Sequence, residues 1–494
     1  MSKKNFLDQQ ETNVYSRIII LGVIVFLEKH VRVRDPIHGM VELNEGEAAI
    51  IKKEAFQRLR NIHQLALTSK VYPGATHTRF EHSLGVMHLA GRVMDSLYKL
   101  RLIKNQFTES EYTRLHQLVR LTGLLHDLGH APFSHGSEEV FLSGLKHEHY
   151  TIAIIRRDFA PIIKEYFPDI KVEEIITLLN KGYLGTDRVF LGKIIDGEMD
   201  ADKLDYLLRD SYYCGVRYGK YDLERILDTV TVVAAKEAHS EIQSEEMVGD
   251  LTGFWLLGID SDGIQALEEL IFARYWMFIQ VYFHKTRRIY DYYLTAFLKD
   301  FLQRKQYPQR NGYFPPPDNL NDYLALDDCT ILEAIKKFRN SNEWARRIFE
   351  RDHLSEAFVT FPQHTGLASY LAVAELKEKF EEKYGSNSQT AHVDDKARRL
   401  LTNPFFGLKK QEEGDKEAEG DRKFDSIVVQ DKHNPEQYYS IFGQSLPLQL
   451  LSQKNINIVR FYVTRNKKEE AAIWCNEQFA QIQAKIKKIE KGWT

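Results

Sequence analysis

The dipeptide His126-Asp127 constrains this chain more than any other feature, because it continues a helical pattern. Four leucines fall at i, i+3, i+4 and i+7 and form one apolar helix face: Leu121, Leu124, Leu125 and Leu128. An imidazole and a carboxylate beside a buried face need partners, because burying unpaired polar groups is costly. A metal ion would satisfy both. The chain has 18 histidines in 494 residues, so one His-Asp pair is expected about once by chance and other segments must decide.

Three further segments offer imidazoles and carboxylates, around His82, His147 and Asp202. His82, Asp202 and the His126-Asp127 pair supply two nitrogen and two oxygen ligands, which suits Mn, Fe, Zn or Mg with positions left for water. Open positions indicate a catalytic metal rather than a structural one. The competing interpretation is a set of ordinary buried, hydrogen-bonded polar residues.

Composition restricts the class of protein. At 43% hydrophobic and 28% charged residues, the sequence is typical of a soluble globular protein large enough for two or more cores. A formal net charge of -3 gives no global basic field for nucleic acid. The three cysteines are far apart and favour a reducing cytoplasm over a disulfide framework. The apolar run at 18–27 is shorter than the roughly 20 residues that cross a bilayer, so we expect no membrane span.

The pattern along the chain predicts a mainly α fold, with a helical core, a helical lobe and a smaller α+β C-terminal region. Helices are expected through 321–383, whereas strands are expected near 424–430, 438–442 and 456–464 and a closing helix over 469–489. The predicted divisions are a β-prone lead at 1–34, the core at 35–300, the lobe at 301–408, a charged flexible linker at 409–422 and the C-terminal region at 423–494.

Two further spacings suggest roles near the metal. On a helix through Asp202, a polar stripe of Lys203, Tyr206 and Asp210 could line a substrate channel while neighbouring leucines face the core. His135 and Glu138 lie at i, i+3, so the carboxylate could orient the imidazole as a general acid. An ion pair between Lys203 and Asp200 is the simpler alternative for that lysine.

Five motifs occur in family order between residues 35 and 301: Asp35-Pro-Ile-His-Gly39, Phe56-Gln-Arg-Leu-Arg60, Tyr72 to Ser83, His126 to His135, and Asp200 to Asp210. With the stretch from Arg274 to Lys285, they make the chain similar to the HD-domain metal-dependent phosphohydrolases, and within them to the deoxynucleoside triphosphate (dNTP) triphosphohydrolases. The resemblance implies an HD-domain helical core, a divalent metal (Mn, Fe, Mg or Zn) and hydrolysis of dNTPs to deoxynucleoside and inorganic triphosphate. We expect no sterile-alpha-motif domain, which vertebrate relatives carry, because the lead leaves no room for one.

The resemblance also implies roles for individual residues. His82, His126, Asp127 and Asp202 hold the metal. The substrate contacts are Gln64, Leu65, Arg79, Lys203, Tyr206, Asp210, Arg274 and Tyr282. In this set the cations and Tyr206 contact phosphates, Asp210 and Gln64 reach the sugar 3′-hydroxyl, and Tyr282 crowds the 2′ carbon. Catalysis involves His135 with Glu138 as proton donor and His130 and His147 beside phosphate oxygens, although the sequence does not rank the three imidazoles.

Regulation and assembly are implied by the resemblance alone. Arg60 and Arg225 are candidate contacts to the phosphates of a nucleotide effector, and a homotetramer or other homo-oligomer is expected. Lys52 stands where guanine-activated relatives have an acidic residue, so guanine recognition there is not predicted. Two other functions stay open: an HD phosphodiesterase or nucleotidase for another phosphate ester, and a nucleotide-sensing module that binds nucleic acid. His38, in the first motif, is expected to tie a turn.

Overall fold

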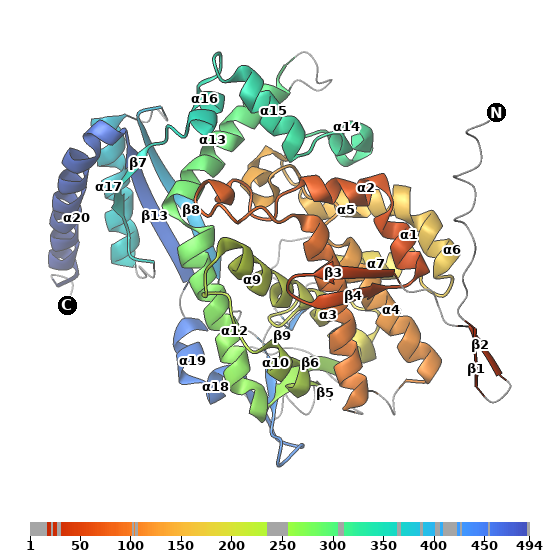
Figure 1. Cartoon of the computed structure of the whole chain (residues 1–494). Coiled ribbons are helices and arrows are strands. Elements are labelled where there is room, and N and C mark those ends of the chain that lie inside the picture. The colour runs from red at the N-terminus through yellow and green to blue at the C-terminus, as the bar shows by residue number, and fades with distance from the viewer. Residues whose placement is uncertain are drawn as a thin grey trace, which may run out of the picture.

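The structure, a computed structural model, describes residues 17–20, 23–26, 31–100, 103, 107–234, 255–304, 311–362, 367–385, 389–400, 406–408, 422–424, 427–452 and 455–491. Within these ranges the fold is mainly α-helical, as predicted (Figure 1). The predicted linker at 409–422 lies outside the described residues except for its last residue.

The first part of the chain supplies most of the helices around the site. They are α1 (Glu45–Ile51), α2 (Glu54–Gln57), α3 (Arg79–Lys99), α4 (Glu109–Leu125), α5 (His147–Ile154), α6 (Ala160–Tyr166), α7 (Val172–Leu179), α8 (Val189–Ile195), α9 (Ala201–Cys214) and α10 (Leu223–Thr229). A second set follows: α12 (Ile264–Met277), α13 (Lys285–Leu302), α14 (Leu320–Leu324), α15 (Asp328–Phe338), α16 (Glu343–Glu350), α17 (Leu367–Tyr384), α18 (Ile441–Gln444), α19 (Leu446–Ser452) and α20 (Lys468–Lys491). The 3₁₀ helix η1 (Arg58–Asn61) extends α2, the π helix η7 (Phe278–Tyr282) extends α12, and the 3₁₀ helix η3 (Ser134–Val140) lies between α4 and α5.

Helices α3, α4 and α9 form the centre of the fold, because α3 packs against both of the others. Each begins at a capping side chain. Glu81 accepts a hydrogen bond from the Thr78 backbone N–H at 2.9 Å, and Asp200 accepts one from the Lys203 backbone N–H at 2.6 Å. Helix α9 ends at Gly215, whose φ of 68° is the left-handed conformation that favours glycine. The apolar faces meet in one core that includes the leucines of the opening motif.

Small sheets complete the fold. Strands β3 (Val31–Asp35) and β4 (Gly39–Leu43) form an antiparallel hairpin, and β1 (Arg17–Ile20) pairs with β2 (Val23–Phe26). Strands β5 (Val230–Ala234) and β6 (Trp255–Asp260) are antiparallel, and β11 (Val428–Gln430) adds to β6 in parallel with β12 (Tyr438–Ser440) at its edge. Strands β9 (Phe406–Leu408) and β10 (Arg422–Phe424) form another pair.

A further sheet lies beside α17 and α20, at the left of Figure 1, and has the order β7-β13-β8. Its strands are β7 (Ser355–Val359), β8 (Ala391–Leu400) and β13 (Asn455–Val463), all antiparallel. The prediction of helices throughout 321–383 was wrong at β7. That strand has only five residues, and its pairing partner lies about 100 residues further along the chain, where a local pattern gives no information. The sheet joins segments from both sides of the predicted linker, and the domain boundaries themselves stay predictions.

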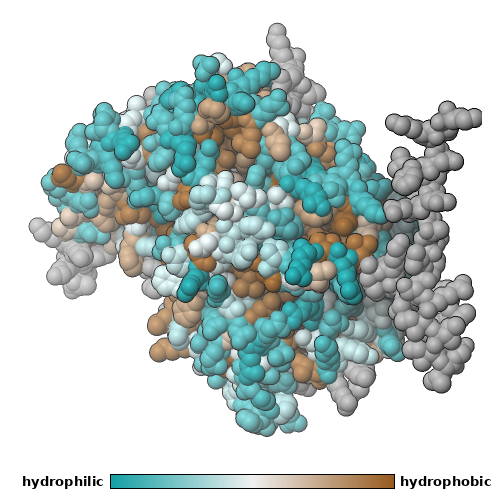
Figure 2. All heavy atoms as spheres, in the orientation of Figure 1, coloured by the Kyte–Doolittle hydropathy of each residue, from teal (hydrophilic) through white to brown (hydrophobic). Residues whose placement is uncertain are grey.

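Figure 2 shows a mainly hydrophilic face on which apolar side chains form separate patches. Among the residues that the structure describes, no helix is both long enough and apolar enough to cross a bilayer.

Candidate functional site

The four predicted metal ligands meet where α3, the end of α4 and the start of α9 converge. His82 Nε2 lies 3.0 Å from an oxygen of Asp202 and 3.5 Å from an oxygen of Asp127. His126 Nε2 lies 3.2 Å from the other oxygen of Asp127 and 3.8 Å from Asp202. The residues come from three segments distant in sequence, yet their ligand atoms converge on one point.

The two imidazoles are oriented for a ligand at Nε2. The Nδ1 atom of His82 is hydrogen-bonded to Asp205 Oδ2 at 2.8 Å, and that of His126 to the Gly123 carbonyl at 2.7 Å. Both Nε2 atoms are buried and have no hydrogen-bond partner among the described residues. A carboxylate or carbonyl on the far nitrogen is the usual support for a histidine that binds a metal. The residues therefore fit a divalent cation.

The electrostatic field at this point also favours a cation. Burial opposes protonation of His82, but the neighbouring carboxylates of Asp202 and Asp205 outweigh it and raise the pKa of His82 to about 10. Burial opposes ionisation of Asp202, but the two histidines outweigh it and lower its pKa to about 2. The carboxylates thus stay ionised and concentrate negative charge between the imidazoles.

A buried network behind His82 was not predicted as part of the site. Asp205 accepts hydrogen bonds from His82, from His38 Nε2 at 2.6 Å, and from two nitrogens of Arg209 at 2.8 Å. Arg209 also donates to Asp35 at 2.8 Å. Two signals could have found the network: Asp205 lies three residues after Asp202, and Arg209 four residues after Asp205, so all three share one side of α9. His38 does belong to a turn, through its backbone N–H to Asp35, but its ring supports the site.

Arg79 is the cation nearest to the predicted ligands. Its Nη1 donates to Asp127, and its Nε donates to Ser134 Oγ at 2.8 Å. Burial opposes ionisation of Asp127, but Arg79, His126 and His130 outweigh it and hold its pKa well below the usual value. The guanidinium contacts Asp127 Oδ2, the same oxygen that lies 3.5 Å from His82 Nε2, so Arg79 and the predicted metal site share this carboxylate.

Three histidines cluster next to the metal ligands, as the sequence predicted. The rings of His130 and His147 stack with centroids 3.8 Å apart, and His130 Nε2 lies 3.2 Å from Asp127. Glu138 Oε1 lies 2.8 Å from His135 Nδ1 and 3.2 Å from His147 Nδ1. The predicted i, i+3 contact between His135 and Glu138 is therefore present, in the 3₁₀ helix η3.

The cluster members differ in charge. Burial lowers the pKa of His130 well below its usual value, helped by Arg79 and His147, so this imidazole is neutral near pH 7. Burial opposes ionisation of Glu138, but His135 and His147 outweigh it and keep its pKa well below the usual value. An ionised Glu138 stabilises a protonated imidazole beside it. His135, with 59% of its side chain exposed, is the partner that a ligand can reach.

The loop that carries these histidines is tightly constrained. A Cβ on Gly129 would lie 2.1 Å from the His147 carbonyl, so only glycine allows α5 to approach. Phe133 and Ser134 both adopt positive φ angles, 63° and 53°. Asp328, from the predicted helical lobe, holds this loop by accepting a hydrogen bond from the Phe133 N–H at 2.6 Å. No local sequence pattern indicated that contact.

Two cations lie beside the first turn of α9. Lys203 Nζ lies 2.5 Å from Asp200 and donates to the Gly197 carbonyl at 2.6 Å, so the predicted alternative of an ion pair is present. Arg274 is buried and donates to Glu198 at 3.0 Å. Burial opposes protonation of Lys203, but Asp200 outweighs it and raises the pKa of the ammonium, which remains charged. Both cations interact electrostatically with Tyr206.

The other predicted substrate contacts come from α9, from η7 and from the segment before α3. Tyr282 donates its hydroxyl to Asp210 Oδ2 at 2.7 Å, and its ring meets that of Tyr206 edge to face at 6.2 Å. Gln64 and its neighbour Leu65 are buried, and Gln64 Oε1 has no hydrogen-bond partner among the described residues. The predicted substrate residues on α9 and η7 thus adjoin one another.

The two candidate effector contacts lie apart from this cluster in other elements. Arg60 Nε donates to Gln57 at 2.9 Å, and its guanidinium covers the ring of Phe80 at 3.5 Å. Arg225 Nη2 lies 3.2 Å from Asp262. The structure does not bring Arg60 and Arg225 into contact within one chain.

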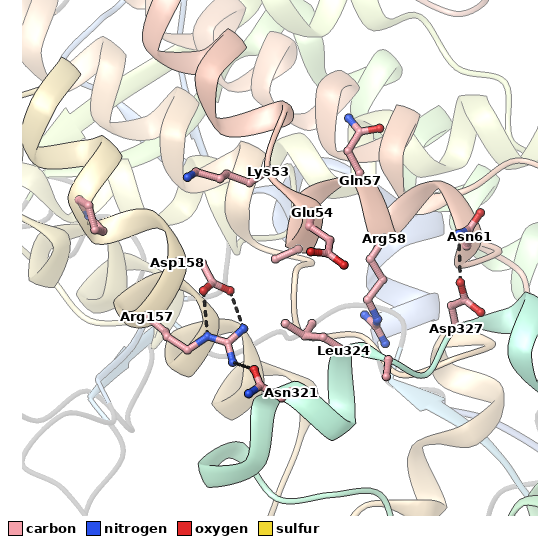
Figure 3. A pocket seen from close by; sticks show the side chains of 13 residues that line it. Lys53, Glu54, Gln57, Arg58, Asn61, Arg157, Asp158, Asn321, Leu324 and Asp327 are labelled. Atoms are coloured by element: carbon pink, nitrogen blue, oxygen red, sulfur yellow. Dashed lines mark hydrogen bonds and ion pairs between the residues drawn. The ribbon is translucent and has the colours of Figure 1, made fainter.

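A polar cavity of about 830 Å³ lies beside α2 and η1 (Figure 3). Lys53, Gln57, Arg58 and Arg157 are among its lining residues. Arg58 connects the cavity to the predicted site, because its Nη1 donates to the His130 carbonyl at 2.9 Å. Its Nε donates to the Leu326 carbonyl at 2.9 Å. Figure 3 shows Arg157 turned toward Asp158 and Asn321 on the opposite side.

Comparison with known proteins gives two family matches. Residues 79–210 match the HD domain, and residues 256–397 match the HD associated region. The first match begins at Arg79 and ends at Asp210, so it encloses the four predicted metal ligands.

Relatives extend the similarity over most of the chain. A Methanocaldococcus jannaschii protein is 35% identical over 67% of this chain and 59% of its own length, and YwfO of Bacillus subtilis is 32% identical over 69% and 75%. The SAMHD1 homolog of Dictyostelium discoideum, named a deoxynucleoside triphosphate triphosphohydrolase, is 33% identical over 63% of this chain and 58% of its own length. The chain therefore spans less than two thirds of the first and third of these relatives.

Two solved structures are similar to this chain over a larger share of its length than the relatives above. A hypothetical protein from Aquifex aeolicus superposes with a TM-score of 0.67 at 28% identity, covering 90% of this chain and 99% of its own. A phosphohydrolase from Bacteroides thetaiotaomicron gives a TM-score of 0.65 at 26% identity, covering 88% and 100%.

Proposed function

The chain belongs to the HD-domain family that includes the dNTP triphosphohydrolases, and from this membership and the site geometry we propose that it hydrolyses dNTPs to deoxynucleoside and inorganic triphosphate. One observation carries the proposal: α9 holds a metal ligand, Asp202, at its start and a buried carboxylate, Asp210, two turns later, with Lys203 and Tyr206 between them. The start of α9 can therefore bind phosphate, and Asp210 can bind a polar group at the other end of the same ligand.

The chemistry divides between the cation and the side chains. A bound divalent ion supplies an activated water and neutralises phosphate charge. Arg79, Lys203 and Arg274 bind the phosphate oxygens, and a preorganised cation in a buried site stabilises charge that develops there. Tyr206 lies between the last two cations and Tyr282, where it orients the phosphates toward the metal end.

His135 is the proton donor in this proposal. Its Nδ1 is held by Glu138, which leaves Nε2 to give a proton to O5′ of the departing deoxynucleoside. His130 is neutral and stacks on His147, which suits a hydrogen bond to a phosphate oxygen. His147 lies 3.2 Å from the same Glu138 oxygen that contacts His135. Attack at the α-phosphorus is supported by the name of the Dictyostelium relative, since the same residues would also serve another phosphate ester.

The sugar end completes the proposed substrate site. Asp210 and Gln64 contact the 3′-hydroxyl, Leu65 lies beside Gln64, and Tyr282 closes the space at the 2′ carbon. A nucleotide effector bound through Arg60 and Arg225, assembly into a homotetramer or other homo-oligomer, and a cytoplasmic location belong to the same proposal.

Product analysis tests the reaction. Purified protein is incubated with each dNTP and NTP, with Mn²⁺ or with a chelator, and with or without added dGTP, and the products are separated by ion exchange. We expect deoxynucleoside and triphosphate from dNTPs only, and none with the chelator. Monophosphate with pyrophosphate, or no turnover under any condition, overturns the proposal.

A further inference from the structure

His77 is a buried histidine with a defined contact at the sugar end of the site. Its side chain is fully buried, and its Nε2 lies 2.7 Å from Asp210 Oδ1. A carboxylate oxygen accepts, so Nε2 donates, and Nδ1 has no partner among the described residues. The ring stacks on Tyr213 with centroids 4.6 Å apart, which fixes its plane.

Asp210 is held from two sides. His77 donates to one carboxylate oxygen and Tyr282 to the other, both at 2.7 Å. Two donors on separate oxygens fix the rotation of the carboxylate, while each oxygen keeps a second lone pair for a ligand. Asp210 is itself almost fully buried, so a ligand hydroxyl would meet it with little competition from water.

The backbone of His77 ties this end of the site to the phosphate end. Its carbonyl accepts from the Gln64 N–H at 3.0 Å, and the Arg79 N–H donates to the Ile62 carbonyl at 3.0 Å. Gln64, His77 and Arg79 therefore share one short antiparallel pairing. This segment therefore fixes the position of Gln64 and, through the His77 ring, of the Asp210 carboxylate relative to the Arg79 guanidinium, which contacts Asp127.

We propose that His77 is a positioning residue for sugar recognition, because it fixes the Asp210 carboxylate, and through it Tyr282, in the orientation that accepts a hydrogen bond from the 3′-hydroxyl. The inference rests on the proposed function. It predicts that His77 affects discrimination at the 3′ position rather than phosphate chemistry.

Equilibrium binding to the full, metal-loaded protein tests the proposal. The probes are hydrolysis-resistant α,β-imido triphosphates of deoxyguanosine and of 2′,3′-dideoxyguanosine, measured by calorimetry. We expect the wild type to prefer the 3′-hydroxyl by about tenfold or more, since a hydrogen bond to a charged group is involved. His77→Ala should lose most of that preference, and His77→Gln, whose Nε2 can still donate, should keep most of it.

A matched control is His116→Gln. His116 is a half-buried histidine on α4, and its Nε2 lies 3.5 Å from an oxygen of Asp95 on α3. This substitution should leave the preference unchanged. Thermal unfolding should show that each variant is folded at the temperature of the assay, even though loss of a buried contact lowers the stability of His77→Ala. Metal content should remain that of the wild type in all variants. Equal affinities of the wild type for the two probes, or a preserved preference in His77→Ala, overturns the inference. If the wild type prefers the 3′-hydroxyl, His77→Ala loses that preference, and the wild type releases monophosphate from dNTPs, the inference about His77 is supported and only the proposed reaction is overturned.

Discussion

At the scale of single residues, the site depends on which nitrogen of each histidine is already engaged. His82 and His126 each use Nδ1 on a protein acceptor and direct Nε2 toward the carboxylates. His135 uses Nδ1 on Glu138, which leaves its Nε2 for a substrate. In all three rings the hydrogen bond at Nδ1 leaves Nε2 available, facing the predicted metal site in His82 and His126 and open to a ligand in His135.

Replacing His135 tests that division. His135→Asn should lower kcat for dNTPs by about 10²- to 10⁴-fold, because general acid catalysis is lost, while metal content stays unchanged. An aryl triphosphate, whose phenolate leaves without a proton, should be hydrolysed at nearly the wild-type rate. His149→Asn, at an exposed histidine on the same α5 helix as His147, is the control and should have little effect. Equal losses for both substrates would assign His135 to binding instead.

At the scale of elements, the site depends on how closely α3 approaches α9. Gly85 lies one turn after His82, and a Cβ there would lie 1.9 Å from Asp205 Oδ1 and 2.6 Å from Arg209 Nη2. Absence of a side chain at Gly85 is therefore what lets the Asp205–Arg209 ion pair sit behind the metal ligand.

Gly85→Ala should consequently destabilise the fold by about 2–4 kcal/mol, because the added methyl displaces a buried ion pair. It should also lower metal affinity, since His82 loses its support. Gly91→Ala lies on the same helix, where the nearest atoms, at 3.1 to 3.3 Å, belong to the flexible side chains of Arg120 and His116. That control should change stability by less than about 1 kcal/mol. Urea unfolding checks both, and similar losses in the two variants would refute the explanation.

At the scale of the whole molecule, the site is assembled from residues far apart in sequence. The convergence of the four proposed metal ligands, and the polar stripe on α9, could be predicted, because each residue lies in a short motif. The spacing of Asp202, Asp205 and Arg209 on α9 could have indicated that they share one side of the helix, but not that Asp205 contacts His82, 123 residues away. The contact of Asp328 with the Phe133 N–H, 195 residues away, could not be predicted. Strand β7 was missed for the same reason: its pairing with β13 is non-local. Sequence patterns record local periodicity, and long-range contacts leave no such pattern.

Stability in acid should also be a property of the whole fold. Burial lowers the pKa of His392, on β8, to about 4, with Lys396 and Arg288 adding to the effect and Asp394 opposing it. The unfolded chain therefore takes up a proton near the ordinary value of 6.5, before the folded chain does. The contribution of His392 is fully present above pH 6.5 and is lost as the pH falls toward 4.

His392→Phe keeps a ring against Tyr292, on which His392 stacks at 4.0 Å, and removes this titration. Between pH 7.5 and 4.5 the variant should lose about 2–3 kcal/mol less unfolding free energy than the wild type. Urea unfolding at the two pH values measures the difference. His88, whose pKa burial also lowers to about 4, remains in the variant, so some acid sensitivity persists. An identical pH dependence in both proteins would show that His392 does not titrate on unfolding.

The metal content of Asp202→Ala tests the central claim most directly. Asp202 is the most exposed of the four ligands, at 36%, so its removal should leave the fold intact by circular dichroism. Asp196→Ala, which removes an exposed carboxylate paired with Lys181, is the matched control. Mass spectrometry of the purified proteins should find about one divalent ion per chain in the wild type and the control, and much less in Asp202→Ala. Equal metal content in all three proteins, or none in the wild type after loading with Mn²⁺, would contradict the account.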